Sequence, residues 1–322
     1  MSFKMLPPIP EPPKPHITTF LYSNFSLKSK LLPILIASSI CLTIRQKDPA
    51  IQIVGYDNDK EVRNRAKKIG LCEIERSIED SVSGAELIIL CVPVGQMQAV
   101  IRKLKKFIKP GTVITDVGSV KLSVIEDIVS HIEDVKGIFV PSHPIAGTER
   151  SGPEAGYAGL FEGRWCILTP TKKTNKKALK SVEAFWKHLG MKTKIMTPEH
   201  HDLVLAVTSH APHLIAYTMV GVVDDLEAVT KSEIINYSAA GFRDFTRIAA
   251  SDPVMWRDIF LNNQDAHLEV LGRFTEELFS LQRAIRKKDG EYLLKYFKRT
   301  RSIRKGIVAA GQDTGTPNFG RD

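Results

Sequence analysis

Apolar and polar residues follow two different periods along the first two thirds of the chain. The run 87–92 is apolar throughout, which predicts a strand covered on both faces. The next segment, 94–108, has apolar residues three or four positions apart, which predicts an amphipathic helix. The same alternation predicts further strands at 51–57, 111–116, 138–140, 165–170 and 192–196, and helices at 59–69, 122–132 and 175–189. This order predicts an α/β fold built on a doubly wound, mostly parallel sheet.

Strand patterns stop after residue 198. Helical spacing continues through 203–223, 258–286 and 291–307, with few residues that would break a helix. We therefore predict an α/β domain over 31–197 and an all-helical domain over 198–310. The tail 311–322 contains Gly, Asp and Pro, and we predict that it is frayed.

The amino-terminal segment does not fit this pattern. Residues 5–15 include six prolines, which predicts an extended, unpacked chain. The apolar run 31–42 starts too late for a signal peptide, and it is too short and too broken by Pro33 to span a bilayer. We predict that 1–30 is an atypical, disordered segment, and 20–30 makes no convincing strand.

Composition narrows the class of protein. A chain of 322 residues with 43% hydrophobic and 25% charged residues can bury two cores. Its four cysteines lie far apart and form no metal-ligand spacing, which predicts buried thiols, a reducing cytoplasmic location and no metal site. The net charge of +9 comes largely from 283–305, where ten Lys and Arg face two acids. Because no nucleic-acid motif accompanies them, a solvated helix face is favoured over a nucleic-acid surface.

His143 is the first candidate for chemistry. It follows the apolar run 137–140, so we place it on a loop at the carboxyl end of a strand, where α/β sheets bind ligands. An imidazole titrates near neutral pH, and Gly147 and Gly152 nearby would let a substrate approach the backbone. His143 is therefore a candidate general base. The alternative is an ordinary hydrogen-bonded loop histidine.

Asp57 ends the predicted strand 51–57. In dinucleotide folds an acid at this place accepts hydrogen bonds from the adenosine ribose, and it repels a 2′-phosphate, which favours NAD over NADP. A strand-terminal Asp before Asn58 and Asp59 could equally cap the following helix. Both interpretations stay open from sequence alone.

Eight stretches in order along about four fifths of the chain resemble the prephenate/arogenate (cyclohexadienyl) dehydrogenase family of tyrosine biosynthesis. They include Asp116-Val117-Gly118-Ser119-Val120-Lys121, Ser142-His143-Pro144-Ile145-Ala146-Gly147-Thr148-Glu149-Arg150-Ser151-Gly152 and Ser209-His210-Ala211-Pro212-His213. The others are 54–57, 160–170, 200–202, 241–249 and 252–258. The resemblance implies a Rossmann-like domain followed by a helical substrate-binding and dimerisation domain. It also implies an NAD-linked oxidation of a ring hydroxyl with loss of the ring carboxylate.

The resemblance implies roles for particular residues. His143 would be the base and Ser119 its hydrogen-bonding partner, and Arg247 would bind a substrate carboxylate through its planar fork. Other substrate contacts would come from His201, His213, Thr148, Glu149 and Trp256. NAD contacts would come from Asp57, Ala37, Ser38, Pro93, Val94 and Ser119. The expected partners are prephenate or arogenate and a second copy of the chain in a homodimer, with no nucleic acid and no membrane.

The chain departs from the family at its amino end. The family's first strand leads into a Gly-x-Gly-x-x-Gly/Ala turn that holds the pyrophosphate. Here 35–40 matches the far side of that turn, but the two glycine places are Leu32 and Ile34, with Pro33 between them. The alternative to an active enzyme is therefore an impaired family remnant. We hypothesise that the sequence before about Leu35 replaced the native beginning through a frameshift or a wrong start.

Overall fold

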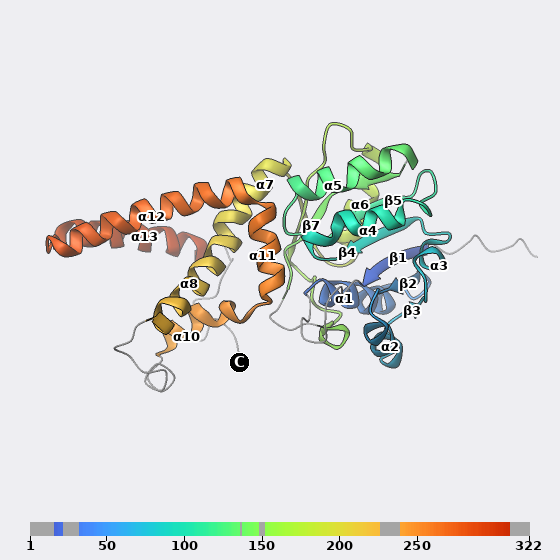
Figure 1. Ribbon diagram of the computed structural model, residues 1–322, viewed down its shortest axis with the longest axis horizontal. Helices are drawn as coiled ribbons and strands as arrows, with labels where there is room; N and C mark the ends of the chain where they lie inside the picture. Colours follow the sequence, from blue (N-terminus) through green and yellow to red (C-terminus); the bar gives the residue numbers. More distant parts are fainter. Residues whose placement is uncertain (1–15, 22–31, 136, 148–151, 226–238, 310–322) are drawn as a thin grey trace, which may run out of the picture. The chain divides into compact units, whose positions relative to one another are not determined.

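A computed structural model describes residues 16–21, 32–135, 137–147, 152–225 and 239–309. The chain divides into two compact units, residues 1–267 and residues 268–322, and Figure 1 labels the helices and strands of each. Unit 1 carries both sheets and every candidate site residue in the described ranges. Unit 2 carries the rest of the long helix α12 (Gln264–Arg286) and α13 (Gly290–Ala309), which an ion pair between Glu277 and Arg299 joins at 3.9 Å.

Six parallel strands in the order β3-β2-β1-β4-β5-β6 form the main sheet of unit 1. They are β1 (His16–Leu21), β2 (Gln52–Tyr56), β3 (Glu73–Ile74), β4 (Leu87–Cys91), β5 (Val113–Asp116) and β6 (Ile138–Val140). Strand order reverses between β1 and β4, and dinucleotides bind beyond the carboxyl ends of the strands at such a point. The predicted doubly wound sheet is confirmed.

The continuous apolar sequence of β4 has a direct structural cause. Ile89 and Cys91 pack into one core with the helices α1 (Leu32–Lys47) and α6 (Lys176–His188). Ile88 and Leu90 point to the other face, into a core with α3 (Ile78–Val82), α4 (Met97–Leu104) and α5 (Leu122–Ile132). Both faces of the strand are therefore covered. Between β2 and β3, α2 (Lys60–Lys68) begins at the N-cap Asp59 and is followed by Gly70 with φ +62°.

The prediction of a disordered segment over 1–30 was wrong for residues 16–21. His16–Leu21 forms β1, which pairs with both β2 and β4 in the middle of the sheet. Its Ile, Thr and Phe residues are typical of a strand, but the proline-rich segment directly before it led to the prediction of an unpacked chain. The helix α1 then starts at Leu32, so the two places that match the family's glycines lie in its first turn. Residues 22–31, between strand and helix, lie outside the described ranges.

A smaller sheet carries the candidate base. Its strands are β7 (Ser142–Pro144), β8 (Trp165–Leu168) and β9 (Lys192–Ile195), with β7 antiparallel and β9 parallel to β8. His143 pairs with Ile167 of β8. The predicted strand-end loop is therefore corrected to a short strand, which fixes the backbone of His143 on both sides.

Helices make up the described chain after β9, apart from short connections. They are α7 (Pro198–Leu205), the π-helical turn η4 (Ala206–His210), α8 (Ala211–Asp225), α10 (Ala240–Thr246), the 3-10 turn η5 (Arg247–Ala250), α11 (Pro253–Asn262), α12 and α13. The 3-10 turns η1 (Val94–Gln96), η2 (Glu133–Val135) and η3 (Pro153–Ala155) occur earlier. A π turn takes up one extra residue, and such turns are frequent at functional sites.

Two close contacts hold the helices of unit 1 against the main sheet. Gly95 approaches α11 so closely that an added Cβ would lie 2.6 Å from the Asp258 carboxylate. The Asp202 carboxylate of α7 accepts hydrogen bonds from the backbone N–H groups of Lys121 and Leu122 at the start of α5, at 2.8 and 2.9 Å. An acid at a helix amino terminus satisfies free N–H groups and complements the helix dipole.

By length and apolarity alone, the helical run 198–223 could cross a membrane. It contains His201, Asp202 and His210, which are buried and make hydrogen bonds within the protein. These pairings place that side of the run in the protein interior, because ionisable groups in lipid are costly.

Candidate active site

Ser142, the residue before His143, is held from four directions. Its N–H donates to Asp116 Oδ1 at 3.1 Å, and its hydroxyl donates to the Asp116 carbonyl at 2.6 Å. The same hydroxyl accepts from the indole N–H of Trp186 at 3.1 Å and lies 2.8 Å from the Thr115 hydroxyl. All of these groups are buried. The start of β7 is therefore a rigid platform for the next side chain.

A buried ion pair lies beneath that platform. The ammonium of Lys121 bonds the Asp116 carboxylate, and both side chains are 0% exposed. Lys121 also donates to the Ser142 carbonyl at 2.8 Å, while Asp116 accepts from the Gly118 N–H at 2.8 Å. Hydrogen bonds to the remaining atoms are what make a buried charge pair tolerable. This pair fixes the turn that carries Ser119 relative to the strand that carries His143.

His143 stands at the end of a chain of buried groups. Its Nδ1 lies 2.8 Å from His201 Nε2, and His201 Nδ1 lies 2.7 Å from Asp202 Oδ1. His201 is 0% exposed and both of its ring nitrogens are engaged within the protein. In the structure, His201 contacts the candidate base, and its predicted role in substrate binding stays a prediction.

The surroundings favour a neutral His143. Burial lowers its pKa well below the ordinary value, and the nearby His201, Lys121 and His210 act in the same direction. Burial also lowers the pKa of His201, against the opposing effect of its hydrogen bond to Asp202. An unprotonated imidazole is the form that a general base requires.

Trp256, predicted to line the substrate pocket, lies in a second group of aromatic side chains. The imidazole of His213 stacks on its indole with ring centroids 3.7 Å apart, and His213 Nδ1 donates to the Ser209 carbonyl at 2.8 Å. Burial lowers the pKa of His213, and the charge of Arg247 lowers it further. The structure thus brings three of the predicted substrate residues together: Arg247 at the start of η5, His213 on α8 and Trp256 on α11.

His210 belongs to the same group but faces inward. Its Nδ1 lies 2.9 Å from His267 Nε2, and His267 Nδ1 donates to the Phe260 carbonyl at 3.3 Å. His210 is 1% exposed, and burial lowers its pKa to about 3. It is a neutral structural histidine in this arrangement. A proton on His210 would lower the pKa of His143, so the two groups lie within electrostatic reach of each other.

Three of the predicted cofactor residues follow the carboxyl ends of strands on both sides of β1. Asp57 follows β2, Val94 follows β4 and Ser119 follows β5. Asp57 is buried, and its Oδ1 accepts the Asp59 N–H at 2.7 Å. The N-cap of α2 is Asp59, so the alternative helix-cap role for Asp57 is wrong. A buried acid at this edge fits the ribose end of NAD.

Ala37 and Ser38 contribute to packing in the structure. Both are 0% exposed, and an added Cβ at Gly156 would lie 2.4 Å from Ser38 Cβ. Small residues are therefore needed where α1 meets the segment after η3. Pro93 is also buried and precedes η1.

Some predicted residues stay untested, and others were missed. Thr148 and Glu149 lie outside the described residues, and the structure shows no hydrogen bond between the described Ser119 and His143. Asp116, Lys121 and Asp202 were part of recognised motifs but received no role. Two features of the sequence indicated such roles: the charged Lys121 in an otherwise apolar turn, and the acid Asp202 directly after His201.

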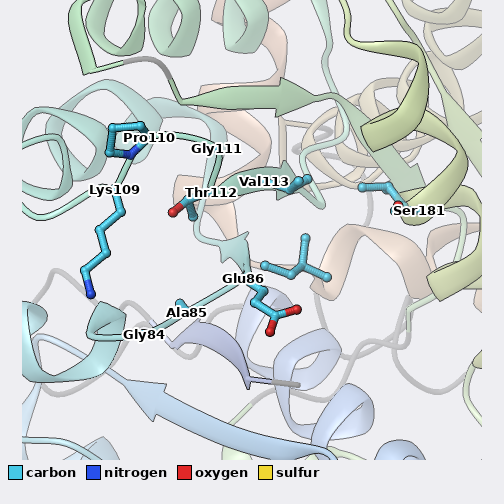
Figure 2. A pocket seen from close by; sticks show the side chains of 11 residues that line it. Gly84, Ala85, Glu86, Lys109, Pro110, Gly111, Thr112, Val113 and Ser181 are labelled. Carbon is cyan, nitrogen blue, oxygen red and sulfur yellow. The ribbon is translucent and has the colours of Figure 1, made fainter. Parts of the chain in front are cut away.

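A separate hollow of about 620 Å³ opens at the amino ends of β4 and β5, opposite the predicted cofactor edge (Figure 2). It is lined by 84–87, 109–113, Ser181 and Val182. The charged ends of Lys109 and Glu86 lie apart in it. This hollow lacks the convergent ionisable groups that surround His143.

Comparisons with known proteins agree with this geometry. The family model described as "Prephenate dehydrogenase, nucleotide-binding domain" matches residues 40–195, and "Prephenate dehydrogenase, dimerization domain" matches 197–299. Cyclohexadienyl dehydrogenase of Zymomonas mobilis is 42% identical over 85% of this chain and 93% of its own length. Prephenate dehydrogenase of Bacillus subtilis is 35% identical over 85% and 74%.

A solved structure gives the same result. Prephenate dehydrogenase of Aquifex aeolicus, crystallised with hydroxyphenyl propionate and NAD+, is 33% identical with a TM-score of 0.81. The match covers 92% of this chain and 99% of that one. These matches show that the chain belongs to the prephenate dehydrogenase family.

Proposed function

We propose that the chain catalyses the NAD-dependent oxidative decarboxylation of prephenate, arogenate or both, in tyrosine biosynthesis. The observation that carries this proposal is the neutral, buried His143, held on β7 with Nδ1 engaged by His201. Its remaining ring nitrogen, Nε2, is the atom that can accept a proton. The relatives are named as dehydrogenases of this kind, and none of the comparisons favours the impaired alternative.

Each group in the site has a proposed task. His143 accepts the proton of the substrate ring hydroxyl, and Arg247 binds the carboxylate that the product retains, beside His213 and Trp256. NAD+, when bound, accepts the hydride. Asp57 holds its ribose, while Val94 and Ser119 line the edge of the sheet between the ribose and His143. The nucleotide-binding domain is proposed to span 31–197, and the substrate-binding domain 198–310.

The described helices of unit 2 support a homodimer. Leu268, Leu271, Phe274 and Leu278, spaced three or four residues apart on α12, are exposed, with Leu268 at 58%. Further exposed apolar side chains follow on both helices: Phe279, Ile285, Leu294, Phe297, Ile303 and Ile307. Large contiguous apolar surfaces mark interaction sites, and the family model for this region is a dimerisation domain. We propose that two copies pair through these helices.

Cofactor binding and turnover test the proposal. The protein should show saturable NADH binding by fluorescence, and it should reduce NAD+ in the presence of prephenate or arogenate. His143→Asn should lower kcat by about 10²- to 10⁴-fold and leave the NADH Kd and substrate KM largely intact. Absence of saturable NADH binding would support the remnant alternative. A loss of only a few-fold in kcat would move the base to another group.

The pH dependence of kcat/KM adds an independent test, because it reports the pKa values of the free enzyme. The base works unprotonated, so kcat/KM falls as the pH drops through its pKa. Because burial lowers the pKa of His143, the plateau of kcat/KM should extend below pH 6.5, the ordinary imidazole value. A limb centred well above pH 6.5 in the parent, and retained in His143→Asn, would assign the titration to another residue.

A further inference from the structure

His143, His201 and Asp202 form a buried chain whose hydrogen atoms can be placed from its far end. The backbone N–H groups of Lys121 and Leu122 can only donate, so both oxygens of Asp202 act as acceptors. His201 Nδ1, at 2.7 Å from Asp202 Oδ1, therefore carries a hydrogen. A neutral His201 then has its lone pair on Nε2, and the neighbouring His143 Nδ1 must donate to it. The lone pair of His143 is left on Nε2.

We propose that His201 and Asp202 are positioning residues that hold His143 in the tautomer with a free lone pair on Nε2. This inference rests on the proposed function, in which His143 is the base. In the step itself, the substrate O–H bond breaks, its electron pair stays on oxygen, and the N–H bond forms at Nε2. His201, backed by Asp202, then faces the resulting imidazolium, in the place that the acid takes beside the histidine of a serine-protease triad.

Burial distinguishes this role from a substrate contact. His201 is 0% exposed and Asp202 is 1% exposed, so neither presents an atom to a ligand at the surface of the site. The charged and titratable groups facing His143 are His201 on α7, Lys121 at the β5–α5 turn and His210 on η4. Among these, His201 bonds the His143 ring directly. Asp202 is also fixed by its two hydrogen bonds to the start of α5, so it cannot turn away from His201.

Asp202→Asn is the sharpest perturbation. With its NH2 in the place of Oδ1, the amide would donate to His201 Nδ1 and give up the bond from the Lys121 N–H, while the amide oxygen keeps the bond from the Leu122 N–H. The hydrogen bonds from residue 202 to His201 and from His201 to His143 would then reverse their direction, which puts a hydrogen on His143 Nε2. We expect kcat to fall by about 10²- to 10⁴-fold, with substrate KM and NADH Kd within about threefold of the parent.

The tautomer can be read without catalysis. Two-bond 1H–15N spectra of the full-length protein labelled with 15N-histidine report which ring nitrogen is protonated, and His143→Asn identifies the His143 signals. The parent should show His143 protonated at Nδ1, and Asp202→Asn should show it protonated at Nε2. If the parent turns over neither prephenate nor arogenate, the proposed function fails, but this spectrum still decides the tautomer.

Asn263→Ala is the matched control. Asn263 is buried and its side-chain amide donates to the Asp202 carbonyl at 2.9 Å, outside the proton chain. The variant should lose thermal stability, keep the parent tautomer, and keep kcat within about threefold. An equal fall in kcat for Asn263→Ala and Asp202→Asn, or an unchanged tautomer in Asp202→Asn, would overturn the proposal.

His201→Gln and His201→Leu cover the case in which Asp202→Asn does not fold. The glutamine carbonyl can accept from His143 Nδ1 and preserve the tautomer, whereas leucine cannot. We expect kcat in the order parent, His201→Gln, His201→Leu, with at least a tenfold step between the two variants. Equal activity of the two variants would also overturn the proposal.

Discussion

Acid should destabilise this fold through His210, and the size of the effect can be worked out from its surroundings. Burial lowers the pKa of His210 from 6.5 to about 3, so the unfolded chain takes up the proton first. Above pH 6.5 the residue contributes nothing to pH dependence. Stability is lost as the pH falls from 6.5 toward 3, at about 1.4 kcal/mol per pH unit. Between pH 7 and pH 5 the loss is about 2 kcal/mol.

Replacing the titrating ring isolates this contribution. In His210→Phe the apolar ring can occupy the place beside Trp256 without a proton to bind, while His201, His213 and His267 remain. Urea unfolding at one protein concentration, at several pH values, gives the difference in unfolding free energy between parent and variant. That difference should shift by about 2 kcal/mol in favour of the variant between pH 7 and pH 5. Ile259→Val, a buried change on α11 without a titrating group, should give an offset that is constant with pH. A pH-independent difference for His210→Phe would refute the reasoning.

Three other predictions concern separate parts of the chain. Lys121→Met leaves Asp116 buried without its ion-pair partner and should lower the free energy of unfolding in urea by about 3–5 kcal/mol. The control Lys173→Met, in the exposed pair with Glu133, should lower it by about 0.5 kcal/mol or less, and equally small losses in both variants would contradict the prediction. Arg247→Lys should raise substrate KM by more than tenfold with kcat much less affected, since a carboxylate pair with bidentate geometry is worth roughly 2–4 kcal/mol, and a large fall in melting temperature with parental KM would indicate a structural role. Light scattering at micromolar concentration should give the mass of a dimer, twice 35.9 kDa, and a monomer mass would exclude the proposed pairing.

Local patterns predicted much of unit 1 closely. The helix 122–132 matches α5 in both bounds, and the apolar run at 87–92 contains β4, because apolar residues with a clear period fill both segments. β1 was missed because His16–Leu21 is supported by β2 and β4, which lie 31 or more residues away in sequence. The residues of β1 favour a strand, but they do not indicate which distant strands it pairs with.

The candidate site was predicted in its parts but not in its connections. His143 and Trp256 were identified from motifs, and the structure places Trp256 against His213. The contact between His143 and His201 joins residues 58 positions apart and depends on how α7 meets β7. No local signal distinguishes a histidine that touches a ligand from one that touches another histidine. Only the fold decides between these roles.

The π-helical turn at 206–210 sets the rotation between α7 and α8. A π turn takes up one extra residue over about the rotation of an ordinary helical turn, so deleting one residue here would restore regular winding and leave α7 and α8 in phase. The same deletion in the regular α-helix between His201 and this turn would rotate everything after it by about 100°. His201 would still face His143, but His213 would turn off Trp256 and Tyr217 off the Ser251 carbonyl. The π turn is therefore a place where this helical run can lose a residue without redirecting the substrate side of the site.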